Sequence, residues 1–133
     1  MLYQLHSDTA PTPSVACVNP IVHWEIAVPD MEAGQEFYTN LCAWSFWSLV
    51  SDTGFAVAEE GGLPLGISLY HTTHIGTTTY VQVDSLDATL ERARSAGGQT
   101  LVGPSPFPGG GRFALTEGVD SNRMGLYEPP PSA

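Results

Sequence analysis

The chain contains no lysine, and its four basic residues are all arginines, set against 14 acidic residues for a formal net charge of −10. Nucleic-acid binding needs a basic surface that neutralises phosphates, and an anionic membrane surface repels a protein of this charge. We therefore expect neither nucleic acid nor membrane as a partner. The missing lysines also favour a bacterial source with a GC-rich genome.

Long apolar runs are missing as well. No window approaches the about 20 consecutive apolar residues that a membrane-spanning helix requires. The N-terminus lacks the basic and apolar segments of a signal peptide. The two cysteines, Cys17 and Cys42, lack the spacing of a metal site. We therefore expect a cytoplasmic protein, whose 133 residues suit one domain.

Residues 1–19 are polar, contain proline and show little hydrophobic periodicity, which predicts an N-terminal arm. Residues 20–133 then form the domain, which opens with a predicted strand over 21–28. Because side chains alternate along a strand, His23 and Glu25 share one face while Trp24 and Ile26 share the other. The strand therefore combines an apolar face with a face that carries two ionisable groups.

The domain reads as one pattern repeated. The first half predicts a strand over 21–28, a helix over 31–41, and strands over 44–50, 55–59 and 64–71. The second half predicts a strand over 77–83, a helix over 85–96, strands over 99–102, 112–117 and 123–128, and a loop over 103–111. In the first helix Phe37, Tyr38 and Leu41 lie at helical spacing. The sequence thus predicts two βαβββ repeats, about 20–75 and 76–130.

Aligning the repeats relates the polar faces of their first strands. His23 then corresponds to Thr78, Glu25 to Tyr80 and Ala27 to Gln82. In both repeats the apolar face should meet the helix, which leaves the more polar face for another role.

Three segments carry a resemblance to a known superfamily. They are the His-containing first strand with its Asp-led helix, the segment VQVDSLDATLERARSAGG, and the segment GVDSNRMGLYEP. In this order and spacing the chain resembles the vicinal oxygen chelate superfamily, which includes glyoxalase I, bleomycin-resistance proteins and extradiol dioxygenases. The resemblance implies an α+β fold in which two βαβββ modules form a U-shaped, incomplete barrel around a cavity. It also implies a homodimer.

The resemblance further implies which side chains face that cavity. They are His23, Glu25, Thr78, Tyr80, Gln82 and Tyr127. Trp47, from an aromatic stretch, is a further candidate for lining a ligand pocket, with core packing as the alternative.

Metal-dependent relatives place one ligand on the first and last strand of each module. His23 stands at the first position, but Thr78 and Gly125 stand where a His and a Glu are usual. One histidine does not hold a divalent ion, so we expect no metal and no other cofactor. His23 with Glu25, or His71 with His74, are alternative partial ligand sets.

Two functions of different classes follow. The first is a binding protein of the bleomycin-resistance kind, which holds a small, partly apolar organic molecule. The second is a lyase, isomerase or epimerase in which His23 and Glu25 act as an acid/base pair, the carboxylate raising the pKa of the imidazole and orienting it. A metal-dependent glyoxalase or dioxygenase with unusual ligands is a third alternative.

Overall fold

In a computed structural model of the chain, residues 18–48, 54–73 and 76–131 are described, and they form two βαβββ modules. The first module comprises β1 (Ile21–Val28), α1 (Met31–Cys42), β2 (Trp47–Ser48), β3 (Phe55–Ala58) and β4 (Ile67–His71). The second comprises β5 (Gly76–Gln82), α2 (Leu86–Ser95), β6 (Gln99–Pro106), β7 (Arg112–Glu117) and β8 (Arg123–Glu128). The predicted α+β class and the duplicated pattern are confirmed. Most of the predicted N-terminal arm lies outside the described residues.

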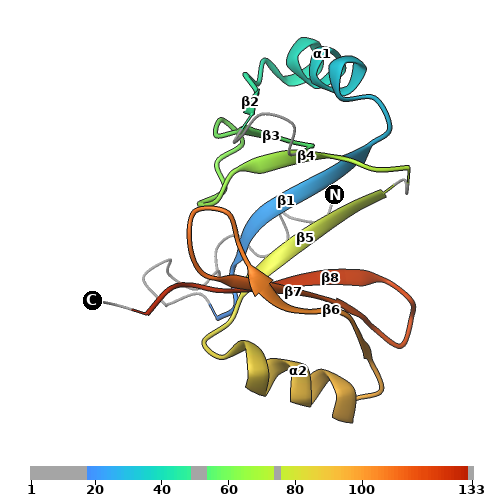
Figure 1. Ribbon diagram of the computed structural model, residues 1–133, viewed down its shortest axis with the longest axis vertical. Coiled ribbons are helices and arrows are strands. Elements are labelled where there is room, and N and C mark those ends of the chain that lie inside the picture. Colours follow the sequence, from blue (N-terminus) through green and yellow to red (C-terminus); the bar gives the residue numbers. More distant parts are fainter. Residues whose placement is uncertain (1–17, 49–53, 74–75, 132–133) are drawn as a thin grey trace, which may run out of the picture.

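The strands form one eight-stranded sheet in the order β2-β3-β4-β1-β5-β8-β7-β6. The first strands of the two modules, β1 and β5, lie antiparallel at its centre, and each pairs in parallel with the last strand of its own module. Strands β2 and β6 are the two edges, so the sheet is not closed into a barrel. Figure 1 shows α1 beside the first module and α2 at the opposite end of the molecule.

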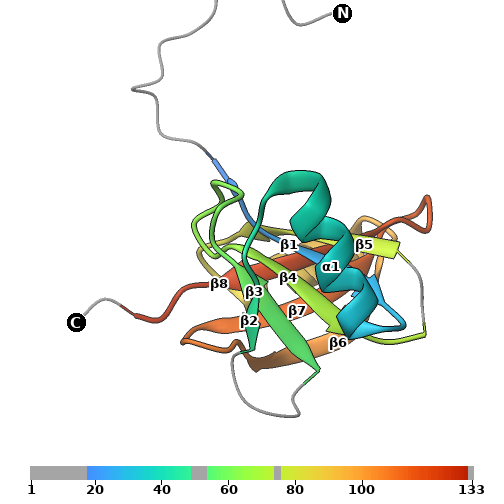
Figure 2. The same cartoon turned by 90° about the horizontal axis from the view of Figure 1, so that it is seen from above.

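Helix α1 approaches the sheet through a glycine. An added Cβ at Gly34 would lie 2.9 Å from Cγ1 of Val28, so only glycine allows this close contact. Met31 and Tyr38 lie on the same side of the helix and pack against the core of the first module. That core is made of Ile26, Val28, Ile67 and Leu69. Figure 2 shows α1 lying across the strands of this module.

The bulky side chains of α1 lie elsewhere than their spacing predicts. Phe37 is 57% exposed and Leu41 is 65% exposed, whereas Tyr38 packs on the core. Gly34, together with Met31 and Tyr38, makes the contact between this helix and the first module. Phe37 and Leu41 therefore form an apolar surface on the outside of α1.

Helix α2 is fixed at its first turn by side chains from two directions. The Ser85 hydroxyl accepts a hydrogen bond from the Ala88 N–H at 3.1 Å, as an N-cap does. The Glu128 carboxylate accepts a 2.7 Å bond from the Leu86 N–H and a 3.0 Å bond from Arg112. Leu86 and Leu90 then bury the apolar side of the helix against β5, β7 and β8. The expectation that each helix meets an apolar sheet face is confirmed.

Three predicted strand boundaries are wrong by three residues or more. Strand β2 begins at Trp47, three residues later than predicted. Strand β6 runs to Pro106, so residues 103–106 belong to the strand rather than to the predicted loop. An edge strand tolerates proline because one of its sides needs no backbone donor. Strand β4 begins at Ile67, three residues later than predicted. No helix in the described part of the chain is long and apolar enough to span a membrane.

Candidate functional site

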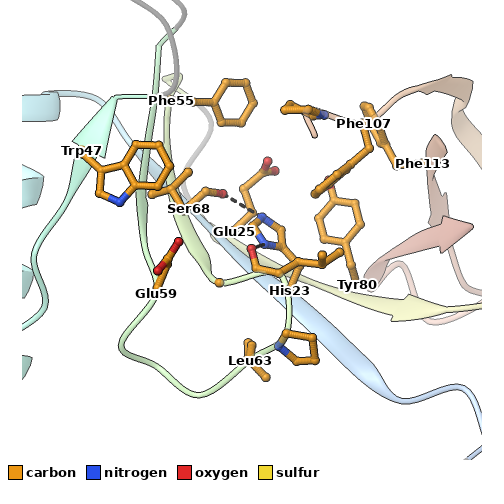
Figure 3. Close-up of a pocket in the computed structure, with 15 residues that line it drawn as sticks. His23, Glu25, Trp47, Phe55, Glu59, Leu63, Ser68, Tyr80, Phe107 and Phe113 are labelled. Carbon is orange, nitrogen blue, oxygen red and sulfur yellow. Dashed lines mark hydrogen bonds between the residues drawn. The ribbon is translucent and has the colours of Figure 1, made fainter. Parts of the chain in front are cut away.

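A cavity of about 510 Å³ opens on the inner face of the U-shaped sheet. Side chains from both modules line it, because β1 and β5 are neighbours at the centre of the sheet. Figure 3 shows the lining, which includes His23, Glu25, Phe55, Ser68, Tyr80 and Phe107. The resulting wall is mainly aromatic, with a few polar groups aimed into the space.

His23 is held in one tautomer by two hydrogen bonds. Its Nδ1 lies 3.1 Å from the Leu65 carbonyl oxygen, which can only accept, so Nδ1 carries the proton. In a neutral ring Nε2 is then an acceptor, and it accepts a hydrogen bond from the Ser68 hydroxyl at 3.0 Å. Burial lowers the pKa of His23. The imidazole is therefore a neutral, fully bonded group at neutral pH.

Glu25 has a different partner and a different charge state. Burial raises the pKa of its carboxyl to about 6, and a hydrogen bond from the Tyr80 hydroxyl opposes that rise. Burial, followed by the nearby Glu25 charge, also raises the pKa of Tyr80, whose side chain is 2% exposed. The hypothesis of a His23–Glu25 pair with a raised imidazole pKa is wrong, because each side chain bonds to other groups and burial dominates the imidazole.

An aromatic cluster fills the inner face of the second module. The Tyr80 ring lies 5.4 Å from the His23 ring and 6.1 Å from Phe113. Phe107, from the loop after β6, lies 5.4 Å from His23 and 5.0 Å from Tyr127. The open cavity therefore lies toward the first module, with these rings as its opposite wall.

The model of one protein family matches residues 20–126, which is nearly the whole described domain. That family is the glyoxalase/bleomycin resistance protein/dioxygenase superfamily. The chain belongs to this superfamily. The resemblance seen in the sequence is confirmed. No match was found among proteins of curated function.

Solved structures of superfamily type share the fold at low sequence identity. Methylmalonyl-CoA epimerase from Mycobacterium tuberculosis is 20% identical with a TM-score of 0.65, the match covering 95% of this chain and 97% of that one. The Mn(II)-bound glyoxalase from Novosphingobium aromaticivorans is 18% identical with a TM-score of 0.64, covering 87% and 42%. A superfamily member from Vibrio splendidus 12B01 is 11% identical with a TM-score of 0.63, covering 84% and 99%.

The residues at the superfamily's ligand positions do not fit a metal ion. Both nitrogens of His23 are engaged by protein groups. At Gly125 an added Cβ would lie 2.3 Å from Cδ2 of Tyr80, so the tyrosine ring occupies the space that a ligand side chain there would need. Glu128 instead bonds to the first turn of α2. No group of three or more His, Cys, Asp or Glu residues gathers among the residues that the structure describes.

The structure does not support either of the partial metal-ligand sets considered from the sequence. His23 and Glu25 have separate partners, as described above. His71 Nε2 lies 3.1 Å from the Pro29 carbonyl oxygen, and His74 lies outside the described residues.

The structure places the other predicted ligand-binding residues in three different surroundings. Trp47 lies at the rim of the cavity, 48% exposed. Thr78 lines a second pocket of about 560 Å³, which shares Glu25 with the first. Gln82 and Tyr127 line neither pocket, and the Tyr127 hydroxyl donates to the Gly110 carbonyl at 3.3 Å. Of the predicted residues, His23, Glu25, Tyr80 and Trp47 thus meet at one cavity.

Sequence reasoning missed several lining residues. Ser68 lies on β4 opposite Glu25, and the period-2 alternation of that strand is the signal that could have found it. Phe55 on β3 follows the same alternation, since Phe55 and Val57 both line the cavity. Phe107 in the Pro/Gly-rich loop carries no comparable signal, because a loop residue reaches the cavity only through the path of the chain.

Proposed function

We propose that this chain is a metal-free superfamily member that binds a small, partly apolar organic molecule in its cavity. The observation that carries this proposal is the preformed space of about 510 Å³ with aromatic walls and few polar groups. Small-molecule sites are typically concave, largely apolar and of about this volume. The metal-free state is supported by the engaged nitrogens of His23 and by the Tyr80 ring over Gly125.

Two measurements test this proposal. Native mass spectrometry of the protein as purified should reveal a retained ligand, and titration followed by tryptophan fluorescence should report binding of added compounds, because Trp47 lines the cavity. Val57→Trp, which fills the cavity from β3, should abolish binding. Leu101→Trp on β6 is the matched control, because Leu101 is 39% exposed and does not line the cavity. Equal binding by both variants would show that the ligand lies elsewhere.

A second candidate function is proton transfer in a lyase, isomerase or epimerase. It is favoured by Glu25, because a carboxyl with a pKa of about 6 at the cavity is matched to general acid/base work near neutral pH. The Tyr80 hydroxyl donates a hydrogen bond to this carboxyl. Epimerase chemistry appears in the name of one structural relative.

Proton exchange tests that candidate directly. Methylmalonyl-CoA in D₂O should exchange its C2 proton in the presence of the protein, and Glu25→Gln should abolish the exchange. Bound substrate without exchange would favour the binding function. The third alternative, metal-dependent chemistry through unusual ligands, predicts stoichiometric metal after dialysis against a weak chelator.

We also propose that the protein is a homodimer in the cytoplasm, with no nucleic-acid or membrane partner. The dimer is supported by the exposed apolar surface of α1 formed by Phe37 and Leu41, which a second copy would remove from water. Light scattering should give twice the chain mass. Phe37→Ser with Leu41→Ser should shift the mass toward that of one chain if this surface is the interface.

A further inference from the structure

The charge inside the cavity is one-sided. Two carboxylates, Glu25 and Glu59, belong to its lining, and the neutral His23 adds no positive charge. All basic side chains of the chain lie among the described residues, and none lines this cavity. They are Arg92 and Arg94 on α2, Arg112, which bonds to Glu128, and Arg123, which lines the second pocket. An anionic ligand would therefore meet carboxylates with no compensating cation.

Aromatic rings surround the inner carboxylate. Figure 3 shows the Glu25 carboxylate pointing into the space between Phe55 from the first module and Phe107 and Tyr80 from the second. Trp47 and Glu59 lie on the first-module side of the same space. The faces of such rings carry negative potential and attract cations, with tryptophan as the strongest of the aromatic side chains.

We propose that the cavity selects an organic cation, whose ammonium group lies near the Glu25 carboxylate and whose apolar body packs against the aromatic rings. This proposal rests on the proposed binding function and names the chemical class of its ligand. A permanent positive charge is the feature that the carboxylates and the rings recognise together.

Desolvation explains why a cation is preferred over a neutral molecule of the same shape. The ionised carboxylate of Glu25 is disfavoured by burial, and the Tyr80 hydroxyl donates a hydrogen bond to it. A neutral ligand would displace water from that carboxylate without supplying an opposite charge in its place. A cation supplies the missing opposite charge, so binding would stabilise the ionised form.

Three probes that share a phenylethyl group isolate the charge. They are trimethyl(2-phenylethyl)ammonium, 2-phenylethanol and 3-phenylpropanoate, each titrated into the full chain by calorimetry at pH 7.5. We expect the ammonium probe to bind at least tenfold more tightly than the carboxylate probe, with the alcohol between them. Glu25→Gln should weaken the affinity for the ammonium probe about tenfold and change the affinity for the alcohol by less than twofold.

Glu91→Gln is the matched control for net charge. Glu91 lies on α2, is largely exposed and pairs only with Arg94 among the ion pairs of the described residues, so its loss changes the total charge equally. It should leave the affinity of all three probes unchanged. A similar loss for both variants would mean that long-range charge, rather than this cavity, attracts the cation, and would overturn the proposal.

The remaining outcomes separate the two proposals. Equal or tighter binding of the alcohol or the carboxylate probe, abolished by Val57→Trp, would overturn cation selection while supporting the binding function. Absence of binding by all three probes at millimolar concentration would contradict both. Tight ammonium binding that survives Val57→Trp would place the cation outside the cavity and overturn the inference.

Discussion

Glu25 should make the stability of the protein depend on pH in a defined direction. Its carboxyl has a pKa of about 6 in the folded chain, raised from 4.5 mainly by burial. A group whose pKa is raised on folding stabilises the fold while it is protonated. That contribution is present in full below pH 4.5 and is lost as the pH rises through about 6.

The expected size follows from the shift. Each pKa unit corresponds to about 1.36 kcal/mol, so the change from 4.5 to about 6 amounts to about 2 kcal/mol. Glutamine cannot ionise, so Glu25→Gln removes the pH-dependent contribution of Glu25 to stability and keeps a side chain of the same shape. The free energy of unfolding of the wild type, minus that of Glu25→Gln, should therefore fall by about 2 kcal/mol between pH 4 and pH 7.

Urea unfolding at half-unit steps of pH measures both curves, and their difference cancels the other titrating groups. A second pair, Tyr80→Phe with and without Glu25→Gln, tests the cause. Because the Tyr80 hydroxyl bonds to Glu25 and lowers its pKa, the second difference curve should fall by a larger amount and continue to fall to a higher pH than the first. A difference that stays constant across this range would falsify the assignment of Glu25 as a buried, destabilised carboxylate.

Three further variants test the packing around the site. Gly125→Ala should cost about 1–3 kcal/mol, because its Cβ would lie 2.3 Å from the buried Tyr80 ring; an unchanged denaturation midpoint would contradict the close contact. Ser68→Ala should cost about 1–3 kcal/mol by leaving His23 Nε2 without a partner, and Ser68→Thr should recover part of the loss by restoring a hydroxyl. Ser85→Ala should cost about 1 kcal/mol in thermal unfolding through loss of the α2 cap, whereas Ser85→Asp should remain close to wild type.

The fold followed from local patterns that tertiary contacts did not override. Alternation along the strand over 21–28, the Ser85 cap and the repeated order of elements each predicted what the structure contains. The first helix was predicted in place, but its contact face was not. The bulky Phe37 and Leu41 stay exposed, whereas Gly34, Met31 and Tyr38 make the contact with the first module. Periodicity marks apolar spacing, and it does not report which side of a helix can come closest.

The candidate site was predictable only in part, for a related reason. Strand alternation placed His23, Glu25 and Tyr80 on one face, and all three line the cavity. Their hydrogen bonds depend on strands that are distant in sequence. The Ser68 hydroxyl on β4, rather than Glu25, bonds to the His23 imidazole. The Tyr80 hydroxyl on β5 bonds to the Glu25 carboxylate.

The sequence by itself determined the class of the fold, the duplication, and the alternation that places His23 and Glu25 on one face of their strand. These depend on spacing along one strand or helix, which the chain carries locally. The tertiary structure decided the charge states and the partners at the cavity. Burial by the neighbouring modules raises the pKa of Glu25 and lowers that of His23, and the Tyr80 ring covers Gly125. Desolvation and steric exclusion arise between segments, so only the folded arrangement of β1, β4, β5 and β8 fixes them.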